Sequence, residues 1–123
     1  MKKISCLFIS IIFIIFLTGC SPDFNGSRTG NDSQFIMEYT AFNTTDSQDL
    51  YVEAGDKISA NIVVDDGNLS IKIQKGKEKP IYKKENVSFS NDFDIDIEES
   101  GIYTVTVTGK KAKGSIRFIV ENN

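Results

Sequence analysis

Alternation of apolar and polar side chains with a period of two residues is the feature that most constrains this chain. From Gln34 onward this period, and not the 3.6-residue period of a helix, recurs in successive short segments. In Asp92–Glu98 acidic residues occupy every second position, and in Ile102–Thr108 threonines alternate with valines. Segments of this kind form strands with one face buried in the core and the other exposed to solvent, so the alternation predicts an all-β domain.

Glycine, proline and clustered polar residues predict where the strands end. Asp65-Asp66-Gly67-Asn68 is expected to be a tight hairpin turn, because Asp-Gly tolerates positive φ. Gly109–Gly114 is expected to be a basic loop. Pro80 is expected to open an edge strand, because proline cannot donate a ladder hydrogen bond. The strands are expected at residues 34–43, 50–53, 58–64, 69–74, 81–84, 92–98, 102–108 and 115–121.

Seven or eight short strands without a convincing helix predict an antiparallel β-sandwich of the jelly-roll type. In such a fold two sheets cover each other's apolar faces, and a barrel is the alternative. The expected core residues are the apolar members of the alternation: Phe35, Tyr39, Ile62, Leu69, Ile71, Ile73, Phe93, Ile95, Ile97, Tyr103, Val105 and Val107.

Five short motifs follow one another between residues 50 and 120. They are Ala54-Gly55-Asp56, Gly67-Asn68-Leu69-Ser70-Ile71, Phe93-Asp94-Ile95, Ser100-Gly101-Ile102-Tyr103 and Gly114-Ser115-Ile116. This order resembles two families of small β-sandwich modules, the GOLD domain and the bacterial pre-peptidase C-terminal domain. The resemblance implies a non-catalytic interaction or accessory module, and it transfers no functional residue.

The first twenty residues have the pattern of an export signal. Lys2 and Lys3 precede an apolar run from Ile4 to Leu17, which is shorter than the roughly 20 residues of a membrane-spanning helix. Leu17-Thr18-Gly19-Cys20 then resembles the lipobox of bacterial lipoproteins. The resemblance implies lipid transfer to the Cys20 sulfur and cleavage between Gly19 and Cys20. It also implies anchoring at the extracytoplasmic face of a bacterial membrane; a plain secretory signal is the alternative.

These features divide the chain into a signal peptide (1–19), a lipidated cysteine with a flexible tether (20–33) and a β-sandwich domain (34–123). The tether is expected because residues 21–33 are polar and contain Pro22, Gly26 and Gly30. The net charge of −3 becomes more negative when the signal lysines are removed. Membrane attachment is therefore expected to depend on the lipid and not on a basic patch.

The composition argues against an enzyme. The chain has no histidine, and cleavage would leave Cys20 as its one cysteine. It has no GxSxG elbow, P-loop or GxGxxG motif, although a Ser-Lys pair stays open. The acidic balance argues against a nucleic-acid partner, and no cofactor is expected.

One predicted strand carries four acidic residues at alternate positions, a pattern that suggests a calcium site. They lie about 6.6–7 Å apart along a straight strand, which is too wide for one ion. We therefore expect no metal and a solvated face beside lysine or arginine neighbours such as Lys72 or Arg117. The four residues concerned are Asp92, Asp94, Asp96 and Glu98.

The predicted role is binding, through protein or polysaccharide contacts. One alternative is a structural subunit of a membrane complex that pairs the edge strand near Pro80 with a partner strand. Another is a hydrolase-associated carbohydrate-binding module. A groove lined by aromatic side chains would favour a carbohydrate or peptide ligand, and the candidates for its lining are Phe42, Tyr51 and Tyr82.

Overall fold

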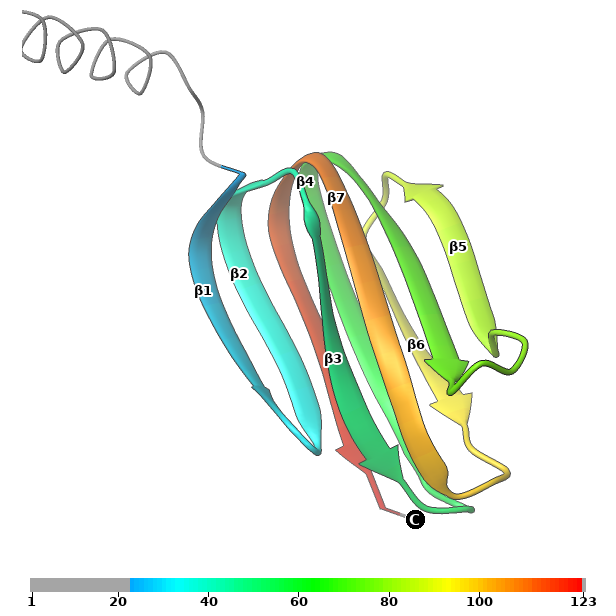
Figure 1. Ribbon diagram of the computed structural model, residues 1–123. Helices are drawn as coiled ribbons and strands as arrows, with labels where there is room; N and C mark the ends of the chain where they lie inside the picture. The colour runs from blue at the N-terminus through cyan, green and yellow to red at the C-terminus, as the bar shows by residue number, and fades with distance from the viewer. Residues whose placement is uncertain (1–22, 123) are drawn as a thin grey trace, which may run out of the picture.

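The computed structural model describes residues 23–122, in which seven strands form one antiparallel sheet (Figure 1). This confirms the predicted all-β class. No helix within the described part is long and apolar enough to cross a membrane. Gly19 and Cys20 lie outside the described residues, so cleavage and lipidation stay predictions. The strands are β1 Phe24–Asn31, β2 Gln34–Phe42, β3 Thr45–Val52, β4 Lys57–Lys75, β5 Tyr82–Val87, β6 Asn91–Asp96 and β7 Gly101–Glu121.

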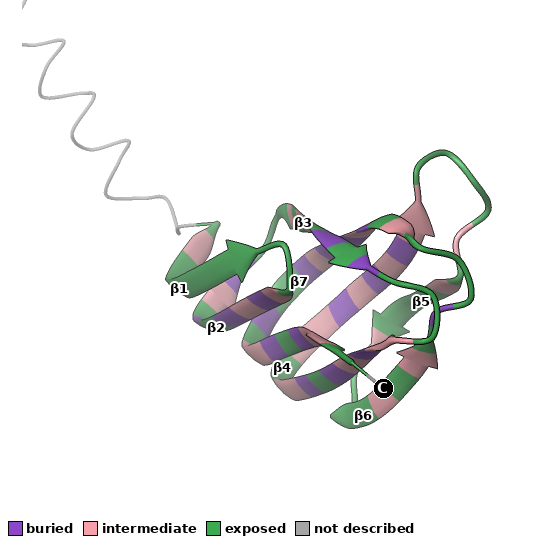
Figure 2. Cartoon of the chain, turned by 90° about the horizontal axis from the view of Figure 1, so that it is seen from below, coloured by how far each residue is buried: buried purple, intermediate pink, exposed green. Residues whose placement is uncertain are grey.

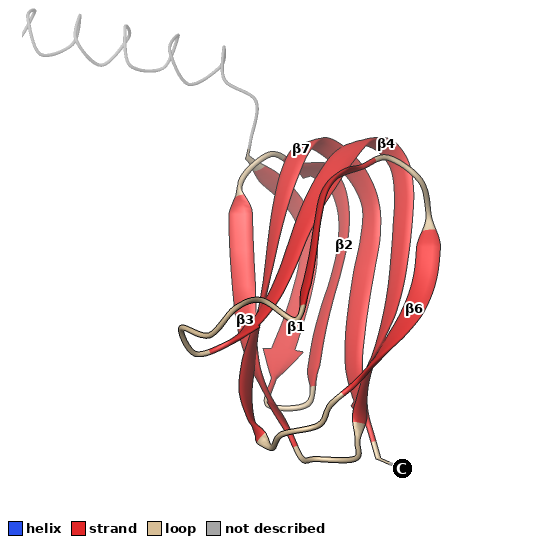
Figure 3. Ribbon diagram, turned by 90° about the vertical axis from the view of Figure 1, so that its right-hand side faces the viewer, coloured by secondary structure: helices blue, strands red, loops and turns tan. Residues whose placement is uncertain are grey.

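The sheet folds over on itself because β4 and β7 are long enough to run through two layers (Figure 3). The first layer has the order β1, β2, second half of β7, first half of β4, β6. The second layer has the order β3, first half of β7, second half of β4, β5. Within the described residues β5 and β6 pair only with β4, so the sheet is an open sandwich and not the alternative barrel.

The hairpin predicted at Asp65–Asn68 is wrong, because β4 continues through this segment. The pairing of β4 with β7 shifts on both sides of Asp66, which marks bulges where β4 passes from one layer to the other. Gly67 has φ +70°, and a Cβ there would collide with the carbonyl oxygen of Lys111. Asp-Gly therefore provides positive φ for a bulge and a close approach of two strands instead of a turn.

The loop predicted at Gly109–Gly114 is also wrong, because β7 continues through it. Asp66 lies opposite Lys113 and Asn68 opposite Lys110, so the two long strands bend together as they change layers. Lys111 has φ +50°, so the strand is irregular there, and Ala112 is the one apolar side chain between Gly109 and Gly114, so the sequence shows no apolar alternation in this segment.

The polar segment predicted to be a tether contains β1, which pairs along its length with β2. A strand can add to a sheet edge through backbone hydrogen bonds alone, so β1 needs almost no buried side chain, and it is exposed except at Phe24. The Phe24 ring packs 6.3 Å from Tyr39 and 5.9 Å from Phe42, measured between centroids. The folded unit therefore includes β1 and does not begin at residue 34. Strand β3 is likewise longer than predicted.

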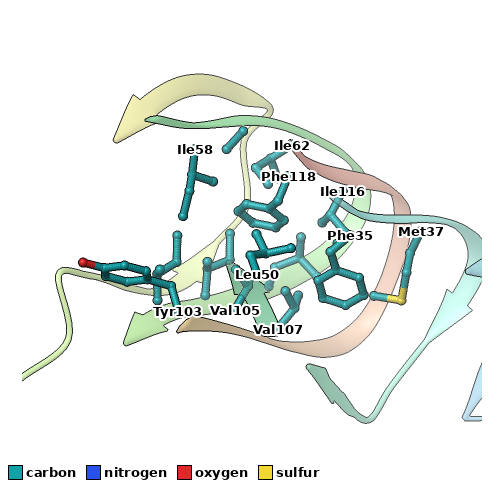
Figure 4. Packing of buried hydrophobic residues seen from close by; sticks show 14 of the residues in the cluster. Phe35, Met37, Leu50, Ile58, Ile62, Tyr103, Val105, Val107, Ile116 and Phe118 are labelled. Atoms are coloured by element: carbon teal, nitrogen blue, oxygen red, sulfur yellow. The ribbon is translucent and has the colours of Figure 1, made fainter. Parts of the chain in front are cut away.

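The core lies between the two layers and confirms the predicted phase of most strands. Figure 2 shows buried residues alternating with exposed ones along β2, β4 and β7, and Figure 4 shows the side chains of both layers meeting. Of the predicted core, Phe93 and Ile95 are only half-buried because β6 lies at an edge. Buried residues that the prediction left out are Met37, Phe42, Leu50, Val52, Ile58, Ala60, Ala112, Ile116 and Phe118.

Candidate functional site

Each layer of the sandwich has two edges, and the edges meet in pairs on opposite sides of the molecule. On one side β1 of the first layer lies beside β3 of the second. On the other side β5 and β6 both border β4. The two sides differ in how the gap between the layers is filled.

The β1–β3 side is closed by one arginine. Arg28 Nε donates to Asp46 Oδ2 at 2.7 Å, and Arg28 Nη2 donates to the carbonyl of Ser47 at 2.9 Å. The guanidinium also lies 4.8 Å from the centre of the Phe35 ring, a cation–π contact. Across the same gap, the Gln48 side-chain amide donates to the carbonyl of Asn31. Side chains thus occupy two carbonyls of these edge strands.

The β5–β6 side is open and forms a cleft with a volume of about 360 Å³. The cleft lies between the two edge strands and the loop that joins them, and its floor is the core side of β4. Its lining is mostly apolar, with three polar residues. The lining residues are Ile62, Ile71, Tyr82, Lys84, Val87, Phe89, Ser90, Asn91 and Phe93.

Two aromatic rings form the wall of the cleft. Tyr82 of β5 and Phe93 of β6 stack with centroids 4.5 Å apart and an interplanar angle of 17°. This stack joins the two layers at the open side, and partial burial raises the pKa of the Tyr82 hydroxyl. A third ring, Phe89, is 80% exposed on the connecting loop. Phe89 lies beside the apolar lining of the cleft, so the ring and the cleft form one partly exposed apolar surface.

The polar groups of the cleft are few. Lys84 lies opposite Ile71 in the β4–β5 pairing, so it shares the core-facing side of that strand. Its ammonium group makes no ion pair within residues 23–122. Ser90 Oγ accepts the Val64 N–H at 3.0 Å, which ties the connecting loop to the bend of β4. Among the residues that the structure describes, Lys84 is thus a cation without an ion pair between the apolar walls of the cleft.

The acidic residues of β6 lie on the outer face of the first layer, as predicted. Their lysine neighbour is Lys57 and neither of the two proposed residues: Lys57 Nζ lies 3.2 Å from Asp94 Oδ2. This hydrogen bond lowers the pKa of Asp94 and raises that of Lys57. Asn61 donates to Asp92, and Arg117 lies beyond Asn61 on β7.

Lys72 lies in the second layer, opposite Lys83, and so cannot neighbour the acidic row. Within the part of the chain that the structure describes, no three Cys, His, Asp or Glu side chains are grouped so as to hold a metal ion. The acidic row is therefore a solvated strand face with one ion pair. The absence of a metal stays a prediction.

The structure places the three predicted groove aromatics apart. Tyr82 lines the cleft, whereas Phe42 is fully buried. Tyr51 lies opposite Ile102 on the outside of the second layer. Phe89 and Phe93 were not predicted as site residues. The irregular alternation around Phe89 could have indicated a site residue, because an aromatic residue outside a regular strand pattern has no assigned place in the core.

A second hollow, of about 660 Å³, lies over the outside of the first layer around Gly26, Glu38 and Gly114. Tyr39 also borders it, but the Tyr39 side chain belongs to the core and its hydroxyl has no hydrogen-bond partner within the described residues. Burial, and then the charge of Asp65, raise the pKa of this hydroxyl. The hollow presents no exposed aromatic ring, so we take the β5–β6 cleft as the candidate site.

Comparison with known proteins shows a shared fold. The pre-peptidase C-terminal domain of collagenase from Bacillus anthracis is 13% identical with a TM-score of 0.50, over 83% of this chain and 99% of that chain. The predicted similarity to this family is thus confirmed at the level of the fold; the GOLD resemblance stays a prediction.

Two further solved structures are similar. PliG of Aeromonas hydrophila, a periplasmic inhibitor of g-type lysozyme, is 14% identical with a TM-score of 0.48, over 83% of this chain and 91% of that chain. A carbohydrate-binding module solved with β-1,4-galactotriose is 16% identical with a TM-score of 0.39, over 79% of this chain and 66% of that chain. No protein-family model and no curated protein matches the sequence.

Proposed function

We propose that this chain is a bacterial lipoprotein whose β-sandwich binds an extended protein segment outside the cytoplasm, without catalysis. The observation that carries the proposal is the cleft on the β5–β6 side, where an apolar surface lies between two strand edges that pair with nothing else in the described part. A strand edge offers unpaired N–H and C=O groups, and an extended peptide satisfies them by adding a strand.

Strand β6 is the better of the two edges for such an addition. Its six residues pair with β4 without a register shift, whereas the β4–β5 pairing shifts and Asn86 of β5 has φ +56°. A strand added to β6 would extend the first layer over the cleft. Its inward side chains would then contact Phe89 and Phe93, and its outward side chains would lie beside the acidic row.

This geometry defines the chemistry of the partner. Inward positions call for apolar side chains, because the cleft walls are apolar. Outward positions call for lysine or arginine, because opposite charges across neighbouring strands are favourable. The proposed ligand is therefore a segment in which apolar and cationic residues alternate.

A polysaccharide ligand is the second candidate, and the exposed Phe89 ring favours it because sugars stack on open aromatic faces. Tyr82 and Phe93, however, turn one face each toward the other. The cleft therefore offers one open ring with few polar neighbours, which suits a peptide better.

The proposal of a lipid anchor rests on one observation, the resemblance of residues 17–20 to the lipobox. Lipid on Cys20 would hold the domain at the membrane, since two acyl chains or more anchor a protein stably. Cys20→Ser should abolish fatty-acid labelling and leave the precursor uncut or release the protein. Fatty-acid label retained by the Cys20→Ser chain would contradict this part of the proposal.

The binding part is tested by photocrosslinking of the full chain in the cells that produce it. Benzoylphenylalanine replaces Phe89 at the cleft or, as the control, Thr29 on the exposed β1 strand. We expect a discrete protein adduct from position 89 and none from position 29. Polysaccharide adducts at position 89, or the same adducts from both positions, would refute peptide binding in the cleft.

A further inference from the structure

One end of the sandwich, where β1 begins, brings together four other segments of the chain; we call it the proximal end. It comprises Asp23, residues 43–44, the β4 bend (65–67), the β5–β6 loop (88–90) and the β7 bend (110–113), at the upper end of Figure 1. Asn43 N donates to the carbonyl of Asp23 at 2.7 Å, and Lys111 N donates to Asn43 Oδ1 at 2.9 Å. The bend of β7 is thus held beside the start of β1.

Three lysines project from the β7 bend: Lys110, Lys111 and Lys113. All are exposed, and none forms an ion pair within residues 23–122. Asp65 and Asp66 of the β4 bend lie at the same end, where Asp66 Oδ1 accepts the Gly67 N–H at 2.9 Å. The proximal end thus carries three lysines without an ion pair in the described part, together with three aspartates, Asp23, Asp65 and Asp66, so its net charge is zero.

The opposite, distal end is acidic. It contains the β1–β2 turn, the β3–β4 turn, the β4–β5 loop, the β6–β7 loop and the end of β7 (Figure 1). Lys75 pairs with Glu99 at 3.2 Å and Lys57 lies 3.8 Å from Glu121, whereas Lys77 and Lys79 of the β4–β5 loop form no ion pair within residues 23–122. The acidic residues of this end are Asp32, Glu53, Asp56, Glu78, Glu98, Glu99 and Glu121, and its lysines are Lys57, Lys75, Lys77 and Lys79. The distal end therefore carries more carboxylates than lysines, whereas the proximal end carries equal numbers of both.

The length of chain before β1 limits how far the proximal end can stand from a lipid on Cys20. Ser21, Pro22 and Asp23 separate Cys20 from Phe24. Four residue steps span at most about 14 Å, even when fully extended. A lipidated Cys20 would therefore hold the β7 bend close to the headgroups, where surface charges interact over roughly one Debye length of 8–10 Å.

We propose that the proximal end docks on an anionic lipid surface, with Lys110, Lys111 and Lys113 against the headgroup phosphates. This inference rests on the anchoring proposed at Cys20. An anionic surface repels the acidic distal end, which then points away from the membrane. The strands run along the membrane normal in this orientation, and the β5–β6 cleft opens sideways, parallel to the surface.

Tryptophan reporters test the orientation, because the chain has no tryptophan of its own. Thr44→Trp places the reporter at the proximal end, and Tyr51→Trp, the matched control, near the distal end. Each full chain is purified from bacterial membranes and reconstituted in phosphatidylcholine vesicles with or without phosphatidylglycerol. Quenching by headgroup-proximal nitroxide lipids is then measured.

In vesicles with phosphatidylglycerol, quenching of Thr44→Trp should exceed that of Tyr51→Trp several-fold. The excess should fall when Lys110, Lys111 and Lys113 are all changed to Gln, and when salt is raised, because salt screens exposed charges. Equal quenching of the two reporters, or an excess that the triple change leaves intact, would overturn the docking.

Failure of the anchoring is scored separately by the intact mass of the purified chain. If the mass shows Cys20 without lipid, the anchoring proposal fails. The Cys20 thiol of the same chain carrying Cys6→Ser is then coupled to a maleimide lipid, and the two reporters are compared again. In that comparison too, equal quenching of the two reporters, or an excess that the triple lysine change leaves intact, would overturn the docking.

Discussion

The two sides of the sandwich differ in how the gap between the two layers is closed. On the β1–β3 side Arg28 and Gln48 each donate to one backbone carbonyl of an edge strand, and Arg28 lies over the Phe35 ring. On the β5–β6 side the layers touch through the stack of Tyr82 on Phe93, and a cleft remains. An occupied carbonyl cannot pair with an added strand, whereas the free edge of β6 has no backbone partner in the described part. This difference is why we propose the β5–β6 side as the binding side.

The largest expected effect contrasts an aromatic residue of each side. Phe35 is fully buried beneath Arg28 and stacks on Phe118, so Phe35→Ala should cost about 3–5 kcal/mol of unfolding free energy. Phe93 is half-buried, and Phe93→Ala should cost about half as much. Urea denaturation of the two variants measures both. Equal losses would mean that the β5–β6 side is packed as tightly as the other.

Gly67 controls the place where β4 leaves the first layer and becomes the neighbour of β5. Gly67→Ala adds a Cβ against the Lys111 carbonyl at positive φ, and we expect a loss of about 2–3 kcal/mol. Gly76 is the matched control: it has φ +56° but open space around it, so Gly76→Ala should cost about 1 kcal/mol. Similar losses of stability for the two variants in thermal melts would argue against a close approach of β4 to β7 at Gly67.

The next prediction compares the loss of stability when a cationic side chain is removed from each side of the sandwich. Arg28→Ala removes three hydrogen bonds, to Asp46, Ser47 and Gln48, and a ring contact, and should cost about 1 kcal/mol because the ion pair with Asp46 is partly exposed. Lys84→Ala on the open side should stay within about 0.5 kcal/mol, since Lys84 has no ion-pair partner in the described part. Chemical denaturation that ranks Lys84→Ala above Arg28→Ala would reverse the comparison.

The smallest expected effect concerns pH. The Lys57 hydrogen bond lowers the pKa of Asp94, so its contribution to stability is present above the unfolded-state pKa near 3.8 and is lost as pH falls through the folded-state value. Lys57→Gln should therefore raise the Asp94 pKa. A carboxyl ¹³C titration by NMR measures it, and an unchanged midpoint would show that Lys57 does not hold the β6 edge.

The sequence predicted the strand faces well because one buried face fixes the alternation. The inward phase of Tyr103, Val105 and Val107, and the outward phase of Asp94, follow from the period of two alone. The prediction failed where backbone conformation, and not side-chain burial, determines whether a strand ends or continues. Asp-Gly at Gly67 provides positive φ equally for a turn or for a bulge in a continuous strand, and only contact with β7 distinguishes them.

Edge strands explain the remaining failures. β1 is held by backbone pairing with β2, which leaves no apolar alternation to detect. The cleft was predicted only through Tyr82, because its other walls come from β6 and a loop whose neighbours depend on the fold of β4. A site formed between two edges is a property of the topology, and no local pattern encodes it.

The most direct test of the account is an NMR titration of the domain with a synthetic peptide of alternating valine and lysine. The amide signals of Asn91–Asp96 should shift most and gain protection from hydrogen exchange, while those of β1 and β3 stay unchanged. A matched valine–glutamate peptide should have no effect. Shifts at the β1–β3 side, or a response to an oligosaccharide and to neither peptide, would contradict the claim that the open edge accepts a strand.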